Sequence, residues 1–88
     1  MKNQRFSNKY NTEVQMYKNV PLRLIVYTEA HFSRLKAKRF MIDGSNQNVW
    51  IPNRFLEPDG TIKSNADIDF VFHKAKRQLE IAKIEFMK

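Results

Sequence analysis

The sequence contains no cysteine, so disulfide bonds and thiolate metal sites are excluded. Its only two glycines, Gly44 and Gly60, lie in turn-forming segments, which leaves no glycine-rich loop to hold a phosphate. The longest apolar run covers residues 24–27 and is far too short to span a bilayer. The N-terminus carries charge without the apolar segment of a secretory signal. We therefore expect a cytoplasmic protein that has no membrane partner.

Acidic residues are scarce in the first half of the chain. Residues 1–40 contain nine Lys or Arg and two Glu, whereas residues 41–88 contain seven residues of each sign. The whole net charge of +7 therefore arises from the first 40 residues. Such asymmetry favours an anionic partner and says little about the fold. A chain of 88 residues that is 42% hydrophobic is sufficient for one small domain.

Groupings of residues typical of enzymes are sparse. The one grouping with candidate chemistry is "DIDFVFH", in which Asp69 and His73 are four residues apart on a helix and Asp67 precedes them. It is compatible with a weak divalent-cation or acid–base site. The alternative, which we favour, is that the aspartates stabilise the start of the helix and His73 lies on the surface. We expect no catalytic residue, no metal site and no cofactor.

The pattern of apolar residues predicts strands in the first half of the chain. Residues 1–12 are polar and basic and are expected to form a flexible arm, and residues 13–88 a single domain. Residues 13–20 favour an edge strand over a short helix. Residues 21–29 form the clearest strand, with Pro21 at its start, and both of its faces are partly apolar, which indicates a central position.

Two turns and a helix follow. Residues 39–53 have two apolar runs around a cluster of Asp, Gly, Ser and Asn, which predicts a hairpin, and "EPDGT" at 57–61 predicts a further turn. Residues 64–88 predict a helix capped by Ser64 or Asn65. Its apolar stripe comprises Ile68, Val71, Ala75, Leu79, Ala82 and Phe86. The expected fold class is α+β, with a small antiparallel sheet of three to five strands covered by one long C-terminal helix.

The stretch "RLKAKRF" at 34–40 carries the densest positive charge. If it is extended, Arg34, Lys36 and Lys38 lie on one face. Phe40 and Ile42 share the parity of these lysines, which predicts a bulge near Lys38 or a change in which face is buried. A row of cations at strand spacing can follow a phosphate backbone. The alternatives are a solvated edge strand, whose lysines deter aggregation, and a short helix over residues 29–38.

These patterns define two candidate surfaces. For nucleic acid, DNA or RNA, we expect phosphate contacts and a stacking ring from Arg34, Lys36, Lys38, Arg39, Phe32, Arg5 and Lys9. Phe55 is a second candidate ring, and Trp50 is either a core residue, which is favoured, or a platform for a base. On the helix, apolar residues beyond the stripe predict contacts with the N-terminal segment or a protein interface, including a homodimer. They are Phe70, Phe72, Ile81 and Ile84.

The segments "FMIDGSNQNVWIPNRFLEPDGTI" and "IDFVFHKAKRQLEIA" resemble small phage and prophage accessory proteins of Gram-positive bacteria. In those proteins a hairpin that closes on a Trp-Ile-Pro motif precedes a C-terminal helix. The family carries no assigned catalytic residues, so the resemblance transfers none. It implies a phage-type accessory protein in the host cytoplasm. We expect a non-enzymatic protein that binds nucleic acid, and the alternative is a protein-binding, anti-CRISPR-like inhibitor of a host defence nucleoprotein.

Overall fold

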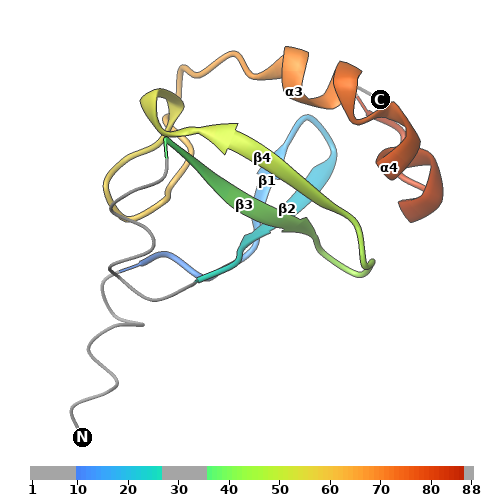
Figure 1. Cartoon of the computed structure of the whole chain (residues 1–88), viewed down its shortest axis with the longest axis horizontal. Coiled ribbons are helices and arrows are strands. Elements are labelled where there is room, and N and C mark those ends of the chain that lie inside the picture. Colours follow the sequence, from blue (N-terminus) through green and yellow to red (C-terminus); the bar gives the residue numbers. More distant parts are fainter. Residues whose placement is uncertain (1–9, 27–35, 87–88) are drawn as a thin grey trace, which may run out of the picture.

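The computed structural model describes residues 10–26 and 36–86 (Figure 1). These residues form an antiparallel four-stranded sheet in the order β1-β2-β3-β4, followed by a short 3-10 helix and two α-helices. Their bounds are β1 Gln15–Tyr17, β2 Val20–Leu24, β3 Ala37–Ile42, β4 Asn48–Pro52, η1 Asn53–Phe55, α3 Asp69–Lys74 and α4 Lys76–Ala82. The predicted α+β class with an antiparallel sheet is confirmed. No helix within 10–26 and 36–86 is long and apolar enough to cross a membrane.

Strands β1 and β2 are joined by a two-residue turn. Tyr17 pairs with Val20, and Lys18 and Asn19 both have positive φ, at 45° and 78°. This is the conformation of a type I′ turn, whose twist matches that of the flanking strands. Strand β1 forms one edge of the sheet and β2 lies between β1 and β3, as the sequence predicted.

Strands β3 and β4 form the predicted hairpin. Their register runs without interruption from Ala37↔Pro52 to Met41↔Asn48. The turn between them contains Gly44 at φ 86° and Ser45, whose hydroxyl donates to the carbonyl oxygen of Ile42 at 2.8 Å. Of the two explanations considered for the parity of Phe40 and Ile42, the bulge is wrong, because every residue from 37 to 41 has one partner on β4.

The turn at residues 57–61 is also present and packs against the sheet. The N–H of Glu57 donates to the carbonyl oxygen of Thr61 at 2.7 Å. Gly60 is required here, because its φ is 90° and a Cβ would lie 2.7 Å from a methyl carbon of Leu24. Asn11, at the described end of the predicted arm, donates from its backbone N–H to the carbonyl oxygen of Asp59 at 2.8 Å.

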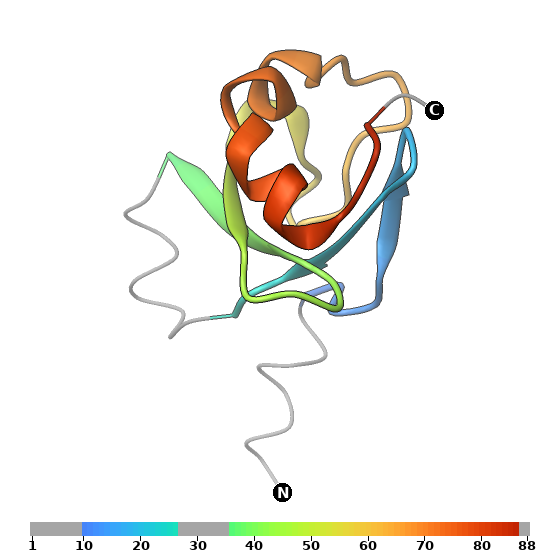
Figure 2. The ribbon, with the colours of Figure 1, turned by 90° about the vertical axis from the view of Figure 1, so that its right-hand side faces the viewer.

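The core lies between one face of the sheet and the two helices. Side chains of β2, β3 and β4 alternate between buried and more exposed along each strand. Figure 2 shows both helices on the same side of the curved sheet. The largest fully buried side chains are Phe40, Phe72, Leu22, Ile42, Ile51, Ile68 and Val20. Burial of this apolar surface is the main favourable term in folding.

The C-terminal segment forms two short helices, α3 and α4, instead of the single long helix that was predicted. Helices α3 and α4 are separated at Ala75, whose φ of −95° and ψ of 27° are not helical, and α4 ends at Lys83 in the left-handed conformation. Neither Ser64 nor Asn65 caps a helix, because α3 begins at Asp69 after Ile68. Residues 64–68 instead lead into the core, where Ile68 is fully buried.

The phase of the predicted stripe is confirmed although the helix is broken. Ile68, Val71, Ala75 and Leu79 are buried, and Ala82 and Phe86 pack against the core. Phe72, for which contacts with the N-terminal segment or a protein interface were predicted, is a core residue at 1% exposure whose ring stacks on that of Tyr17 in β1. Ile84 is half-buried against the core. Phe70 and Ile81 remain exposed, at 40% and 55%.

Candidate nucleic-acid interface

One face of the sheet is not covered by the described helices. The side chains that alternate with the buried ones on β2, β3 and β4 point to this outer face. They include Arg23, Arg39, Met41 and Trp50, and Met16 of β1 lies 64% exposed on the same side. The outer face therefore combines guanidinium groups with apolar and aromatic side chains.

Trp50 and Arg39 form a pair on the outer face, near the β4 edge of the sheet. They are direct partners in the β3–β4 register, and the Arg39 Cζ lies 5.8 Å from the centroid of the Trp50 ring. Trp50 is 46% exposed, because its neighbours Val49 and Ile51 occupy the buried face of β4. Of the two interpretations of Trp50, the favoured one, a core residue, is wrong. A half-exposed indole beside a guanidinium group is available to stack on a flat ligand.

Lys38 does not belong to an exposed row of cations. It is 8% exposed and shares the buried face of β3 with Phe40 and Ile42. Its Nζ donates to the Oδ1 of Asn53 at 3.1 Å, and desolvation by burial lowers its pKa below the usual value. Because β3 has no bulge, Lys38 and Arg39 point to opposite faces of the sheet.

The other predicted contact residues are divided between the described and the remaining parts of the chain. Lys36 is described and exposed. Arg34, Phe32, Arg5 and Lys9 lie outside the described residues. The short helix considered for residues 29–38 also lies largely outside them, and residues 37 and 38 belong to strand β3.

Arg23 is a cation of the outer face that lay outside the predicted set. Its Nε donates to the Oδ1 of Asp43 at 3.2 Å, and one of its terminal nitrogens donates to the carbonyl oxygen of Thr12 at 3.1 Å. These bonds hold its guanidinium group in place at the surface. Phe55, a candidate stacking ring, packs against the core and has Arg54 4.7 Å above its ring.

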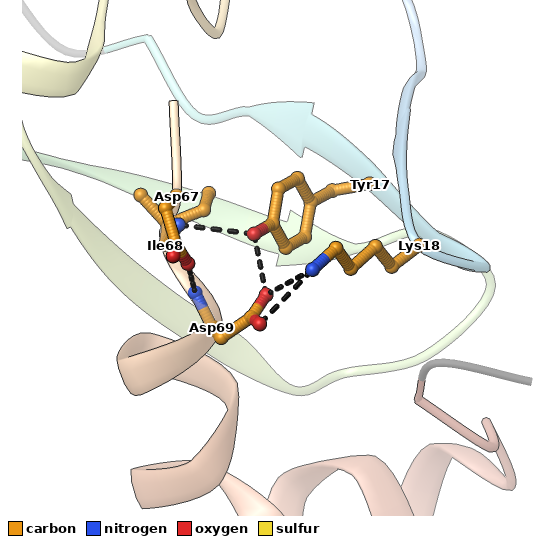
Figure 3. Close-up of polar contacts among 5 residues, drawn as sticks. All are labelled: Tyr17, Lys18, Asp67, Ile68 and Asp69. Atoms are coloured by element: carbon orange, nitrogen blue, oxygen red, sulfur yellow. Dashed lines mark hydrogen bonds and ion pairs between the residues drawn. The ribbon is translucent and has the colours of Figure 1, made fainter. Parts of the chain in front are cut away.

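Figure 3 shows the contacts that occupy Asp69, the aspartate considered for metal or acid–base chemistry. Its Oδ1 accepts a hydrogen bond from the hydroxyl of Tyr17 at 2.5 Å, and the ammonium group of Lys18 lies 3.0 Å from the same carboxylate. The Tyr17 hydroxyl also accepts from the buried N–H of Ile68 at 3.0 Å. The network therefore joins the β1–β2 turn to the start of α3.

These contacts support the structural interpretation of Asp69. No group of three or more His, Cys, Asp or Glu side chains capable of holding a metal ion occurs among the described residues. His73 is exposed and meets the edge of the Phe86 ring, with the ring centroids 5.6 Å apart. The hydrogen bond from Tyr17 lowers the pKa of Asp69, and burial raises the pKa of Tyr17. Asp69 thus acts as an anionic anchor for the fold.

The depressed pKa of Asp69 predicts a pH-dependent contribution to stability. A carboxylate whose pKa is lower in the folded state stabilises the fold above its ordinary pKa of 3.8, and this contribution is lost as the pH falls through the lower folded value. We expect the melting temperature to fall between about pH 5 and pH 2, and to fall less steeply in Tyr17→Phe, which lacks the hydroxyl donor. Thermal melts of both proteins across this range measure the difference. Parallel curves would show that Asp69 is not the anchor.

No protein-family model matches the chain, and neither the search of curated proteins nor the search of solved structures found a significant match.

Proposed function

We propose that the protein is a non-enzymatic binding module that holds single-stranded nucleic acid on the outer face of its sheet. The observation that carries the proposal is the half-exposed indole of Trp50 with the partly buried guanidinium group of Arg39 beside it, on the face opposite the helices. An aromatic ring can stack on any base, and a guanidinium group beside it can contact a phosphate or the same base. Lys36, exposed immediately before β3, supplies further positive charge beside the sheet.

The charge of the whole chain supports an anionic partner. The described residues contain eleven Lys or Arg and eight Asp or Glu. The remaining residues contain five Lys or Arg and one Glu, among them Arg5, Lys9 and Arg34 of the predicted set. Neutralisation of phosphates by such groups releases counterions and strengthens binding at low salt. We propose that these cations assist the outer face electrostatically.

The proposed setting is that of a small phage-type accessory protein in the host cytoplasm. The support for it is the resemblance of the hairpin and the C-terminal segment to phage accessory proteins, together with the absence of cysteine. In this setting we propose that the protein acts by occupying nucleic acid rather than by chemistry on it.

The adjacent residues Lys38 and Arg39 provide a matched test, because they lie on opposite faces of β3. Substitution of either one by a neutral residue removes one positive charge. Arg39→Gln is expected to weaken binding of a labelled single-stranded oligonucleotide several-fold and to lower the salt slope by about one unit. Lys38→Met is expected to bind within about twofold of the wild type, because a buried cation makes no phosphate contact. Fluorescence anisotropy at two salt concentrations, with single- and double-stranded DNA and RNA, measures these effects.

Thermal melts establish that both variants are folded before they are compared. Equal losses of affinity in the two variants would mean that only overall charge matters and that the outer face is not the site. Absence of binding by the wild type even at low salt would reject nucleic acid as the partner.

A protein-binding inhibitor of a host defence nucleoprotein is the second candidate. It is favoured by the exposed apolar side chains of Phe70 and Ile81 on the helices. Retention of one host nucleoprotein from a nuclease-treated lysate, lost with Ile81→Glu, distinguishes this function from direct binding of nucleic acid.

A further inference from the structure

An open groove lies between strand β4 and the helices. Its volume is about 360 Å³, and its lining includes Trp50, Pro52, Phe70, Lys74 and Gln78. Phe70 and Lys74 are four residues apart on α3, so they lie on one face of that helix, and Gln78 of α4 lines the same side of the groove. The floor is apolar, because it includes Val49 and Val71 from the core.

The other side of the groove is a sheet edge with hydrogen-bonding capacity. Strand β4 is the last strand of the described sheet. At one end of the β3–β4 hairpin, the N–H of Ile42 donates to the carbonyl oxygen of Gln47 at 2.8 Å. At the other end, the N–H of Asn53 donates to the carbonyl oxygen of Lys36 at 2.9 Å. Because such pairs alternate along an antiparallel ladder, Val49 and Ile51 also bond to β3. The backbone groups of Asn48 and Trp50 therefore point away from β3.

These outward groups are not used within the described parts of the chain. No backbone hydrogen bond joins Asn48 or Trp50 to another described residue outside the β3–β4 ladder. An edge strand with unpaired N–H and C=O groups is a template for another extended chain. Pro52 ends the template, since it has no N–H to offer. An edge of this kind beside an apolar groove and a helix fits the addition of a peptide strand.

The charges around the groove determine the chemistry of the occupant. Lys74 is its charged lining residue, no Asp or Glu lines it, and Arg39 lies against Trp50. A second copy of this chain paired through β4 would bring these cations close to their own copies. Alternating N–H and C=O groups match a polypeptide backbone better than a sugar-phosphate backbone.

We propose that the β4 edge binds an extended acidic peptide segment of a partner protein. The segment adds as a strand to β4, places an apolar side chain between Trp50 and Phe70, and directs a carboxylate at Lys74. This inference goes beyond binding of nucleic acid, because it rests on the backbone edge of β4 and on Lys74 and Phe70, which take no part in the contacts proposed for the outer face.

The test is selection of random twelve-residue peptides by display against the full chain. The selected peptides are expected to alternate apolar with other residues and to be enriched in Asp and Glu. Their binding is expected to slow hydrogen exchange of the Asn48 and Trp50 amides. Phe70→Ala and Lys74→Glu are each expected to weaken the best peptide about fivefold to tenfold. Both positions are exposed, so these variants are expected to fold.

N-methylation of the selected peptide provides a matched control. Methyl groups on the amides that face β4 are expected to abolish binding, whereas methyl groups on the alternate amides are expected to be tolerated. The proposal is overturned if no peptide is selected, or if the best peptide is insensitive to both substitutions and leaves the two amides unprotected. It is also overturned if a single-stranded oligonucleotide or self-association, rather than a peptide, protects those amides.

Discussion

The Trp50→Ala variant is expected to bind single-stranded nucleic acid about tenfold more weakly than the wild type. Stacking of a base on an aromatic side chain contributes about 1–3 kcal/mol by alanine substitution, which is a factor of roughly 5 to 150 in affinity. Trp50 is 46% exposed on the outer face and has Arg39 beside it, so the variant loses both the stacking surface and the partner that orients the guanidinium group. Anisotropy titrations at low salt measure the loss.

Trp50→Phe is the control for this prediction. It keeps an aromatic surface and is expected to retain most of the affinity of the wild type. Both variants are expected to melt within a few degrees of the wild type, since neither removes a buried side chain. If Trp50→Ala binds as tightly as the wild type while remaining folded, Trp50 is not the stacking platform.

Phe72→Ala is expected to cost about 3–5 kcal/mol of unfolding free energy. Phe72 is 1% exposed. The centroid of its ring lies 5.5 Å from that of the Tyr17 ring and 5.3 Å from that of the Phe86 ring. Its removal leaves a cavity where α3 meets the β1–β2 hairpin and the C-terminal residues. Small domains have a total stability of about 5–15 kcal/mol, so the loss is a large share of the whole. Urea unfolding followed by circular dichroism measures it.

Phe70→Ala, two residues away on the same helix, is the matched control. Phe70 is 40% exposed, so the same chemical change is expected to cost about 1 kcal/mol or less. The comparison separates burial from the helix propensity of phenylalanine, because both substitutions change that propensity equally. Equal losses of unfolding free energy in the two variants would contradict an α3 that buries Phe72 and exposes Phe70.

Local patterns predicted most of the sheet. The cluster of turn-forming residues between two apolar runs placed the β3–β4 hairpin correctly, and Pro21 marked the strand that became β2. The apolar stripe correctly predicted which residues of the C-terminal segment face the core, because apolar residues recur on the side of a helix that packs against the core. The length of the helix did not follow from the spacing of these residues. Its late start at Asp69 coincides with hydrogen bonds that join Ile68 and Asp69 to Tyr17, about 50 residues away, and no local feature of the sequence marks the interruption at Ala75.

The orientation of Lys38 is where the sequence interpretation failed. The signal was present, since Lys38 shares the parity of Phe40 and Ile42, but the parity was explained by a bulge or by a change in the buried face, and burial of the lysine itself was not considered. Lysine is rarely buried without a partner, and Asn53, fifteen residues away, was not identified as one. The Tyr17–Asp69 contact, across 52 residues, likewise had no local signal. The type I′ turn at Lys18 and Asn19 was missed because it contains no glycine.

Intrinsic fluorescence during titration with a single-stranded oligonucleotide reports directly on stacking at the outer face, because Trp50 is the only tryptophan in the chain. If a base stacks on the outer face, the emission of Trp50 is expected to be quenched in step with binding seen by anisotropy, and the quenching is expected to be reversed by added salt. Binding that leaves the emission of Trp50 unchanged, or no binding at low salt, would contradict the proposed function.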